Sequence, residues 1–445
     1  MIRKLLRRVF RRTEPSAHEP ATIPAARHGI RRTDISPGSR RTCEMLQEAG
    51  FKAYVVGGAV RDLIAGLEPK DFDVATDATP DQVRGIFRRS RVIGRRFQIV
   101  HVMHGAETIE VSTFRAAHDA DTQKDEHGRV LRDNVWGSQA EDAARRDFTI
   151  NALYFDPAME TVLDYHHGVA DLKQKTLRMI GEPRARFRED PIRLLRAVRF
   201  SAKLGLSLDP AVRAPIREMA PLMENVPPAR LFDEMLKLLS SGHSVECVKR
   251  LRDEGLHHGL LPLLDVILEQ PLGERFVMLA LADTDERVRS DKPVSPGFLF
   301  ATLLWHEALA NWEARKAAAE SPIPALFAAM DEVLDRQAEK LAITRRISGD
   351  IKDIWALQPR FEKRAGRAPF RVIEQPRFRA GYDFLRLRAA SGEVDAELPD
   401  WWRAFQETDH AGREAMLVPD DGTKKRRRPR RRSRKADESS AELPT

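Results

Sequence analysis

Apolar and polar positions follow two different spacings along the chain, and the change falls near residue 170. Before it, short apolar or alternating runs predict strands, with helices expected over residues 38–49 and 80–88. The strands are expected at residues 53–56, 71–74, 91–94, 98–103 and 108–114. After it, apolar residues recur every three or four positions, which is typical of helices. These helices are expected over residues 191–204, 229–239, 245–251, 297–309, 323–341 and 380–390.

Two segments lack either spacing. Residues 13–34 are rich in Pro, Ala, Arg and His and predict a linker, so the ordered part is expected to begin near residue 35. Residues 115–143 are polar with few core-forming side chains, which predicts a mobile loop. The pattern as a whole predicts a head of strands and helices, then helical domains, then a basic tail.

A glycine pair, Gly57-Gly58, directly follows the apolar strand at 53–56, and an acidic strand holding Asp71 and Asp73 comes next. Glycines let backbone amides approach a polyphosphate. Side chains alternate along a strand, which places Asp71 and Asp73 on one face. Carboxylates that close repel, and both stay ionised at neutral pH only if cations lie between them. Mg²⁺ suits this pair because it prefers carboxylate oxygen and leaves positions for phosphate.

Two later segments add further polar chemistry. Residues 145–152 combine two arginines, a carboxylate and an amide. The Arg146 guanidinium suits triphosphate oxygens, and Asn151 could reach a ribose hydroxyl. Residues 189–200 predict a helix whose arginines form a partly aligned basic row, at positions Arg193, Arg196 and Arg199. Taken alone, that helix reads as an ordinary amphipathic helix.

Charge is unevenly distributed in this chain of 445 residues, whose net charge is +8. Residues 424–435 carry +10, residues 1–12 carry +6 and residues 436–445 carry −3, which leaves −5 for residues 13–423. Such basic runs are usually disordered and often bind nucleic acid. The apolar positions of residues 1–12 also allow a weak contact with a membrane surface. With no apolar run long enough for a membrane span, no signal peptide pattern and only two cysteines, a cytoplasmic protein is expected.

The ordered motifs resemble those of the class II nucleotidyltransferases, the group of bacterial poly(A) polymerases and CCA-adding enzymes. They are Gly57-Gly58 with Arg61-Asp62, Asp71-x-Asp73, Arg145-Arg146-Asp147-Phe148 with Asn151-Ala152, and Glu189-Asp190-x-x-Arg193. Residues 92–102 are similar to the segment that distinguishes the bacterial poly(A) polymerases, where the CCA-adding enzymes differ. Residues 375–384, Trp401-Trp402 and the Arg-rich tail favour the same subgroup.

The resemblance implies an α+β fold: a small mixed-sheet nucleotidyltransferase head, all-helical neck, body and leg domains, and disordered basic tails. The expected divisions are an N-terminal extension (1–34), the head (35–170), a nucleotide- and RNA-binding neck (171–260), a helical RNA-binding domain (261–415) and the tail (416–445).

The resemblance also implies a role for each motif residue. Asp71 and Asp73 would hold Mg²⁺, and Asp147 would complete the catalytic carboxylates. Glu110, on the polar face of the strand at 108–114, is the alternative third carboxylate. The residues expected to bind the nucleotide are Gly57, Gly58, Arg61 and Arg146 at the triphosphate, Asn151 at the ribose, and Asp190 and Arg193 at the adenine edge, with Arg196 nearby.

The implied activity is template-independent polyadenylation of RNA 3′ ends, with ATP as the AMP donor, release of pyrophosphate, two-metal catalysis and a role in RNA turnover. A CCA-adding tRNA nucleotidyltransferase is the alternative, and a non-catalytic RNA-binding protein is a second one. Expected partners are RNA 3′ ends and ATP, with proteins of RNA decay or RNA chaperones as further candidates.

Overall fold

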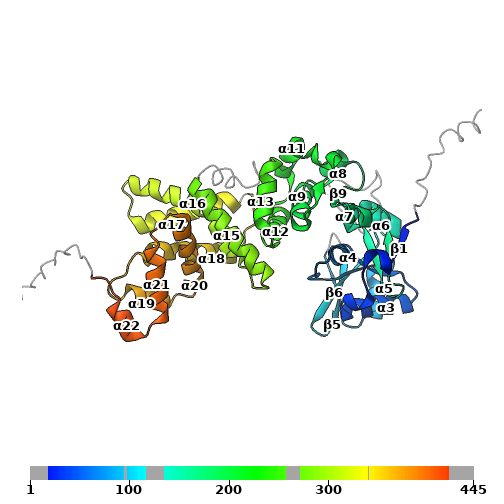
Figure 1. Cartoon of the computed structure of the whole chain (residues 1–445), viewed down its shortest axis with the longest axis horizontal. Coiled ribbons are helices and arrows are strands. Elements are labelled where there is room, and N and C mark those ends of the chain that lie inside the picture. Colours follow the sequence, from blue (N-terminus) through cyan, green and yellow to red (C-terminus); the bar gives the residue numbers. More distant parts are fainter. Residues whose placement is uncertain (1–18, 95–97, 117–134, 257–270, 339, 420–445) are drawn as a thin grey trace, which may run out of the picture.

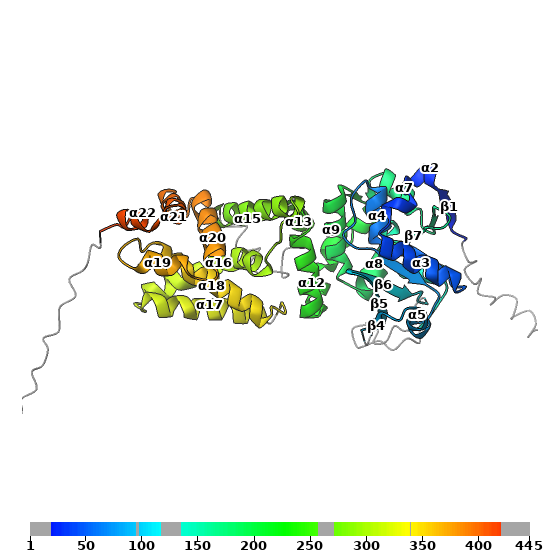
Figure 2. The ribbon, with the colours of Figure 1, turned by 90° about the horizontal axis from the view of Figure 1, so that it is seen from below.

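The computed structural model describes residues 19–94, 98–116, 135–256, 271–338 and 340–419. A mixed α/β head forms one end of an elongated molecule, and helices form the rest (Figure 1). β1 and α22, the first and last elements in the described part, lie at opposite ends in both ribbon views (Figure 2). The basic runs at residues 1–12 and 424–435, together with their expected disorder and membrane contact, lie outside the described residues.

The head is built on one eight-stranded sheet with the order β1-β8-β7-β2-β3-β6-β5-β4. All neighbours are antiparallel except β3 and β6, which are parallel, so the sheet is mixed as expected. The strands are β1 (Ala21–Pro24), β2 (Ala53–Val56), β3 (Asp73–Thr76), β4 (Ser90–Ile93), β5 (Ile99–His104), β6 (Glu107–Thr113), β7 (Leu153–Asp156) and β8 (Thr161–Asp164). β9 (Thr176–Leu177) and β10 (Ser207–Leu208) form a separate parallel pair.

The two faces of the sheet have different surroundings. Val55, Val74, Val111 and Val100 are partners across four strands and are buried under α3 (Pro37–Glu48). Successive residues of a strand point to opposite faces, so the residue before each valine faces the other way. On that other face, Asp73 and Glu110 are partners in the parallel β3–β6 pair. The alternation expected for residues 108–114 is confirmed.

The helices of the head and of the neighbouring segment are short. They are α2 (Ala25–His28), α4 (Gly58–Ile64), α5 (Pro80–Ile86), α6 (Gln139–Arg145), α7 (Gly168–Lys173), α8 (Pro183–Glu189), α9 (Arg193–Leu204), α10 (Pro210–Arg213), α11 (Ile216–Met219), α12 (Pro228–Leu239) and α13 (Ser244–Asp253). Three 3₁₀ turns cover Arg32–Asp34, Thr149–Asn151 and Ala220–Asn225. α9 packs against α12 and α13 and stands between them and the head in both ribbon views.

Helices fill the described part of the C-terminal half, and most of them are longer than those of the head. They are α15 (Pro271–Arg289), α16 (Pro296–Ala317), α17 (Pro322–Ala338), α18 (Arg345–Phe361), α19 (Ala368–Ile373), α20 (Phe378–Ser391), α21 (Glu397–Glu407) and α22 (His410–Ala415). One apolar core continues from the head through α9 and α12 to α18 and α20, and a smaller core surrounds Trp402. None of the helices in the described ranges combines the length and apolar character that a membrane span needs.

The expectation of a linker up to residue 34 is wrong for residues 19–34. β1 pairs with β8 at the edge of the sheet, and Ile30 is buried in the head core. The His28 ring forms a hydrogen bond with the carbonyl of Glu160. This segment is ordered by β8, about 140 residues later in the sequence, and local periodicity cannot predict such a distant pairing.

The polar segment 115–143 is also not irregular throughout. Its central part lies outside the described residues, but α6 begins at Gln139. Ser138 and Glu141 form reciprocal side-chain to backbone hydrogen bonds at the start of α6, a capping box that needs no apolar periodicity. Among the helices of eight or more residues, α15, α18 and α21 were not expected.

Candidate active site

A hollow of about 650 Å³ lies between the head and the helices α9 and α12. It brings together all the predicted site residues except Glu110, namely Gly57, Gly58, Arg61, Asp71, Asp73, Arg146, Asp147, Asn151, Asp190, Arg193 and Arg196. The same hollow is lined by residues that the sequence analysis did not assign, namely Ile192, Arg199, Phe200, Arg230, Asp233, Glu234 and Lys237. Motifs spread over more than a hundred residues therefore meet in one place.

The glycine pair forms the turn between β2 and α4. Gly57 has φ 68° and ψ −118°, a conformation that belongs to the first central position of a type II′ turn and strongly favours glycine. A Cβ at Gly57 would lie 3.2 Å from Nη1 of Arg146, so this position also requires a residue without a side chain. α4 begins at Gly58 immediately beyond this turn.

Gly57→Ala is therefore expected to destabilise the fold by about 1–3 kcal/mol, because alanine is strained at this φ and crowds Arg146. Urea unfolding of the full chain measures the change. Gly85→Ala in α5 is the matched control, because Gly85 has open space around it and a negative φ. It should cost nothing, and equal losses in both variants would refute the turn argument.

The carboxylates of the acidic motif stand at the start of β3, next to the glycine turn. Asp73 is the first residue of β3, whereas Asp71 precedes the strand, and both line the hollow. Burial, then Glu110 and Asp71, raises the pKa of Asp73 to about 6, and Arg146 opposes the shift. Glu110 and Asp71 thus lie near enough to disfavour the ionised form of Asp73.

This donor set fits Mg²⁺. Within the ranges described by the structure, no three His, Cys, Asp or Glu side chains form a ready-made metal cluster. Mg²⁺ does not require one, since it commonly takes one or two carboxylates and fills its other positions with water and substrate phosphate. A cation between Asp71 and Asp73 would also relieve the repulsion that raises the pKa of Asp73.

Asp147 is held by partners on both oxygens. Its Oδ1 accepts hydrogen bonds from the Phe148 backbone (2.8 Å) and from Asn151 Nδ2 (2.9 Å), and its Oδ2 pairs with Arg196 Nε (2.7 Å). Burial would raise the pKa of Asp147, but Arg196 and these hydrogen bonds hold it at about 2. The carboxylate stays ionised and ties the head to α9.

The asparagine and arginine side chains extend this network. Arg61 Nη1 donates to Asn151 Oδ1 at 2.6 Å, while Arg61 Nε donates to Asp62 at 2.8 Å. Both side-chain groups of Asn151 are thus used inside the protein. Arg146 Nη1 donates to the Asn151 carbonyl at 3.1 Å and Nη2 pairs with Asp142. These guanidinium groups are preset before any ligand binds.

Residues of α12 complete the far side of the hollow. Asp190 Oδ2 pairs with Arg230 Nη2 (2.8 Å), and Glu234 pairs with Arg199 Nε (2.6 Å). Arg193 Nη1 donates to Glu189 (2.8 Å). The sequence motifs did not point to the α12 residues, although Arg230, Asp233, Glu234 and Lys237 share one helical face. Their charged character on an otherwise apolar helix was the available signal.

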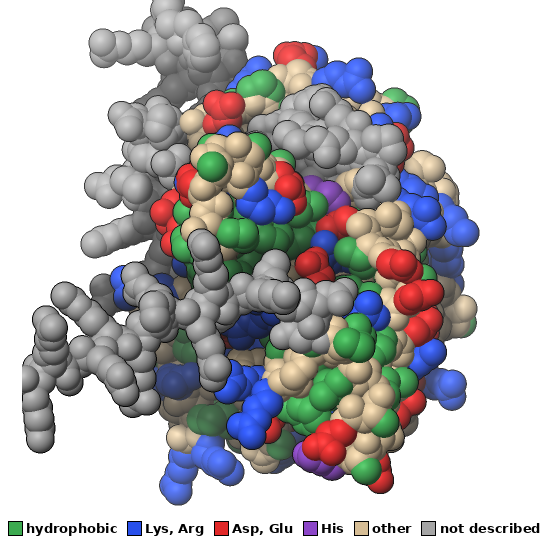
Figure 3. All heavy atoms as spheres, turned by 90° about the vertical axis from the view of Figure 1, so that its left-hand side faces the viewer, with side chains coloured by type: hydrophobic (Ala, Val, Ile, Leu, Met, Phe, Trp, Pro, Cys, Tyr) green, Lys and Arg blue, Asp and Glu red, His purple; other side chains and the backbone are tan. Residues whose placement is uncertain are grey.

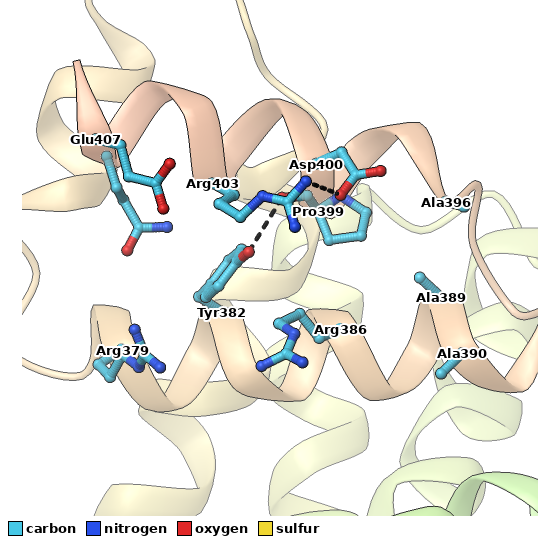
Figure 4. Close-up of a pocket in the computed structure, with 11 residues that line it drawn as sticks. Arg379, Tyr382, Arg386, Ala389, Ala390, Ala396, Pro399, Asp400, Arg403 and Glu407 are labelled. Atoms are coloured by element: carbon cyan, nitrogen blue, oxygen red, sulfur yellow. Dashed lines mark hydrogen bonds and ion pairs between the residues drawn. The ribbon is translucent and has the colours of Figure 1, made fainter.

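A second hollow, of about 700 Å³, lies between α20 and α21, far along the chain from these motifs (Figure 4). Its arginines face acidic neighbours: Arg403 pairs with Asp400 at 2.9 Å, and Arg379 pairs with Asp383 at 3.3 Å. Viewed from this end, the surface carries both Lys or Arg and Asp or Glu side chains (Figure 3). This hollow therefore lacks the glycine turn and the carboxylate pair of the first.

Comparison with known proteins assigns the family. The poly A polymerase head domain matches residues 53–178, the probable RNA and SrmB-binding site of polymerase A matches residues 205–268, and the polymerase A arginine-rich C-terminus matches residues 318–436. Poly(A) polymerase I of Salmonella typhimurium is 43% identical over 97% of this chain and 96% of that protein. The chain belongs to the poly(A) polymerase I family. The same protein of Haemophilus influenzae is 44% identical over 93% of this chain and 95% of its own length.

CCA-adding enzymes share a smaller part of the chain. The enzyme of Geobacillus thermodenitrificans is 39% identical over 47% of this chain and 51% of its own length. Among solved structures, the Bacillus stearothermophilus CCA-adding enzyme in complex with CTP superposes with a TM-score of 0.59 at 26% identity, covering 83% of this chain and 82% of that one. The α+β fold class expected from the resemblance is confirmed.

Proposed function

We propose that this protein is a polynucleotide adenylyltransferase that transfers AMP from ATP to the 3′-hydroxyl of RNA without a template and releases pyrophosphate. The observation that supports it most is the single hollow in which a glycine turn, a carboxylate pair and the basic row of α9 meet. The near full-length similarity to poly(A) polymerase I favours adenylation over CCA addition.

Asp71 and Asp73 are the proposed ligands of Mg²⁺. When bound, Mg²⁺ supplies a Lewis acid that activates the hydroxyl and neutralises the departing pyrophosphate. The chain's own contribution is orientation: the Gly57-Gly58 backbone leaves room for the triphosphate, and Arg61 and Arg146 hold fixed positive charge beside it.

We propose that Glu110, rather than Asp147, is the third carboxylate near the metal site. Glu110 is the strand partner of Asp73 and contributes to its raised pKa. Both carboxylate oxygens of Asp147 already have partners, namely Asn151 and the Phe148 backbone on one and Arg196 on the other. Its proposed role is to position Arg196 and Asn151, and Asn151 in turn orients Arg61 and stays within reach of the ribose.

The adenine edge is proposed to face Asp190 and Arg193, with Arg196 nearby. Arg230 holds one oxygen of Asp190, while Asp190 Oδ1 has no hydrogen-bond partner in the part of the chain that is described. A buried carboxylate oxygen without a partner accepts a hydrogen bond readily, and the exocyclic amino group of adenine could donate one to it.

The domain divisions at residues 171–260, 261–415 and 416–445 are proposed with these roles, the helical parts binding RNA, and the head before them includes residues 19–34. RNA 3′ ends and ATP are the proposed partners, and RNA-decay or RNA-chaperone proteins are proposed further partners. The proposed place of action is the cytoplasm, where a role in RNA turnover would be exercised.

The test supplies each nucleotide separately to the purified full chain with Mg²⁺. We expect long, heterogeneous extension of an unstructured RNA with ATP and at least about tenfold less with CTP, as expected for one missing base-specific contact. A tRNA that lacks its CCA end is the second acceptor. Efficient, limited CTP incorporation into that tRNA would contradict polyadenylation and favour CCA addition, and no incorporation at all would favour a non-catalytic RNA-binding protein.

A further inference from the structure

A row of polar residues crosses four neighbouring strands and begins at the proposed metal site. Asp73 is the partner of Glu110, Glu110 is the partner of His101, and His101 is the partner of Arg91. Residues opposite one another in a sheet project from the same face. The row therefore leads from the proposed catalytic carboxylates of β3 and β6 to the edge strand β4.

Within this row, His101 contacts Glu110 directly. His101 Nε2 lies 3.2 Å from Glu110 Oε1, and the two side chains are 24% and 52% exposed. No other side chain in the described ranges pairs with Glu110. An imidazole with hydrogen on Nε2 donates to a carboxylate whether the ring is neutral or charged, so the contact needs no change of protonation.

Glu110 needs such a partner more than Asp73 does. A half-exposed glutamate with three rotatable bonds loses considerable rotamer freedom when it is fixed. Asp73 has a shorter side chain and begins a central strand. The orientation of Glu110 is therefore the less constrained of the two, and a charge-assisted hydrogen bond would restrict it.

His101 also lies in a segment whose purpose the proposed function leaves unexplained. Residues 92–102 are similar to the segment that distinguishes bacterial poly(A) polymerases from CCA-adding enzymes. Residues 92 and 93 belong to β4 and residues 99–102 to β5, outside the hollow lined by the other motifs. The contact with Glu110 links this segment to the reaction.

We propose that His101 is a positioning residue that fixes the orientation of the Glu110 carboxylate from the side opposite Asp73, and so sets the geometry of the metal-binding carboxylates. The inference rests on the proposed role of Glu110 in adenylation. It assigns to the 92–102 segment a function in tuning metal binding rather than in recognising RNA or nucleotide. Arg91, at the far end of the row, is not required by it.

The experiment uses the full chain with His101→Ala and His101→Gln. Glutamine can place an amide donor near the Nε2 position, so it should restore most of the lost function. For His101→Ala we expect turnover to fall by about 10-fold or more, as is usual when a partner that orients a metal ligand is lost. The Mn²⁺ dissociation constant, measured by electron paramagnetic resonance without ATP or RNA, should rise by about 10-fold or more. KM for ATP and for RNA should stay within about twofold, because this interaction is not a substrate contact.

A matched control is Thr108→Ala, an exposed position on the same strand and face as Glu110, two residues before it. It should match the wild type in turnover and in Mn²⁺ binding. His101→Asn serves as a second variant with a shorter amide, and it should behave like His101→Ala because its donor falls short of Glu110.

The Glu110→Gln background separates the failure of this inference from the failure of the proposed function. If His101 acts through Glu110, His101→Ala should cause no further loss in that background. An equal loss in both backgrounds, a rise in KM for RNA alone, or wild-type behaviour of His101→Ala would overturn the positioning role. A wild-type protein that adds no adenylate, or a fully active Glu110→Gln variant, would instead overturn the proposed function or the role of Glu110.

Discussion

Replacing Asp73 by asparagine is expected to lower ATP-dependent extension of RNA by about 1000-fold or more. The variant keeps the size of the side chain but loses the charge that would hold Mg²⁺ at the start of β3. Loss of metal assistance removes several kcal/mol of transition-state stabilisation, and about 4 kcal/mol corresponds to about 1000-fold in rate. Asp71→Asn is expected to act similarly.

Single-turnover extension of a labelled RNA measures this effect, and a filter or gel assay measures RNA binding in parallel. RNA affinity should stay within about threefold, because proteins bind RNA mainly through Lys and Arg side chains that contact the phosphates. Asp81→Asn removes an exposed carboxylate from α5 in the same head and should leave the rate unchanged. Near wild-type extension by Asp73→Asn would refute the assignment of the metal site.

Replacing Asp147 by asparagine is expected to act mainly on stability. Arg196 would lose its 2.7 Å partner while its other ion pair, to Glu234, is long at 3.8 Å. Hydrogen bonds to charged groups contribute about 1.5–3 kcal/mol, so a loss of about 2 kcal/mol in the free energy of unfolding is expected. Urea unfolding followed by a signal from the head gives the value.

The pH dependence of that loss identifies its cause. The folded pKa of Asp147 is depressed from 3.8 to about 2, so its contribution is fully present above about pH 4 and is lost as the pH falls toward about 2. The shift corresponds to about 2 kcal/mol. The difference in stability between wild type and Asp147→Asn should therefore be constant from pH 5 to 7 and shrink below pH 4.

Glu110→Gln is the counterpart that separates the two carboxylates. Glu110 is half exposed, so its replacement should change stability by less than about 0.5 kcal/mol while lowering turnover strongly. The reverse outcome, with Asp147→Asn stable but unable to bind metal, would support Asp147 as the third carboxylate.

Local patterns in the sequence were sufficient for several parts of the fold. The alternation of Ile109 and Glu110 places the glutamate on the polar face of β6, because side-chain direction along a strand is a local property. The row of arginines on α9 and the glycine turn after β2 are local in the same sense, and both line the hollow.

Other parts depend on contacts between distant segments. β1 is ordered by pairing with β8, which lies about 140 residues later. The partner of Arg199 is Glu234 on α12, and the partner of Asp147 is Arg196 on α9. The motif around Asp147 correctly placed this residue at the site. The hydrogen bonds of both its carboxylate oxygens depend on tertiary packing, which the spacing of residues in the sequence does not predict.

A crystal structure of the protein with a non-hydrolysable ATP analogue, Mn²⁺ and a short RNA tests the account most directly. Anomalous scattering would locate Mn²⁺ without ambiguity. The account predicts metal on Asp71 and Asp73 near Glu110, the triphosphate beside Gly57-Gly58, and the adenine toward Asp190 and α12. Metal bound at any other place, or the nucleotide seated in the hollow between α20 and α21, would contradict it.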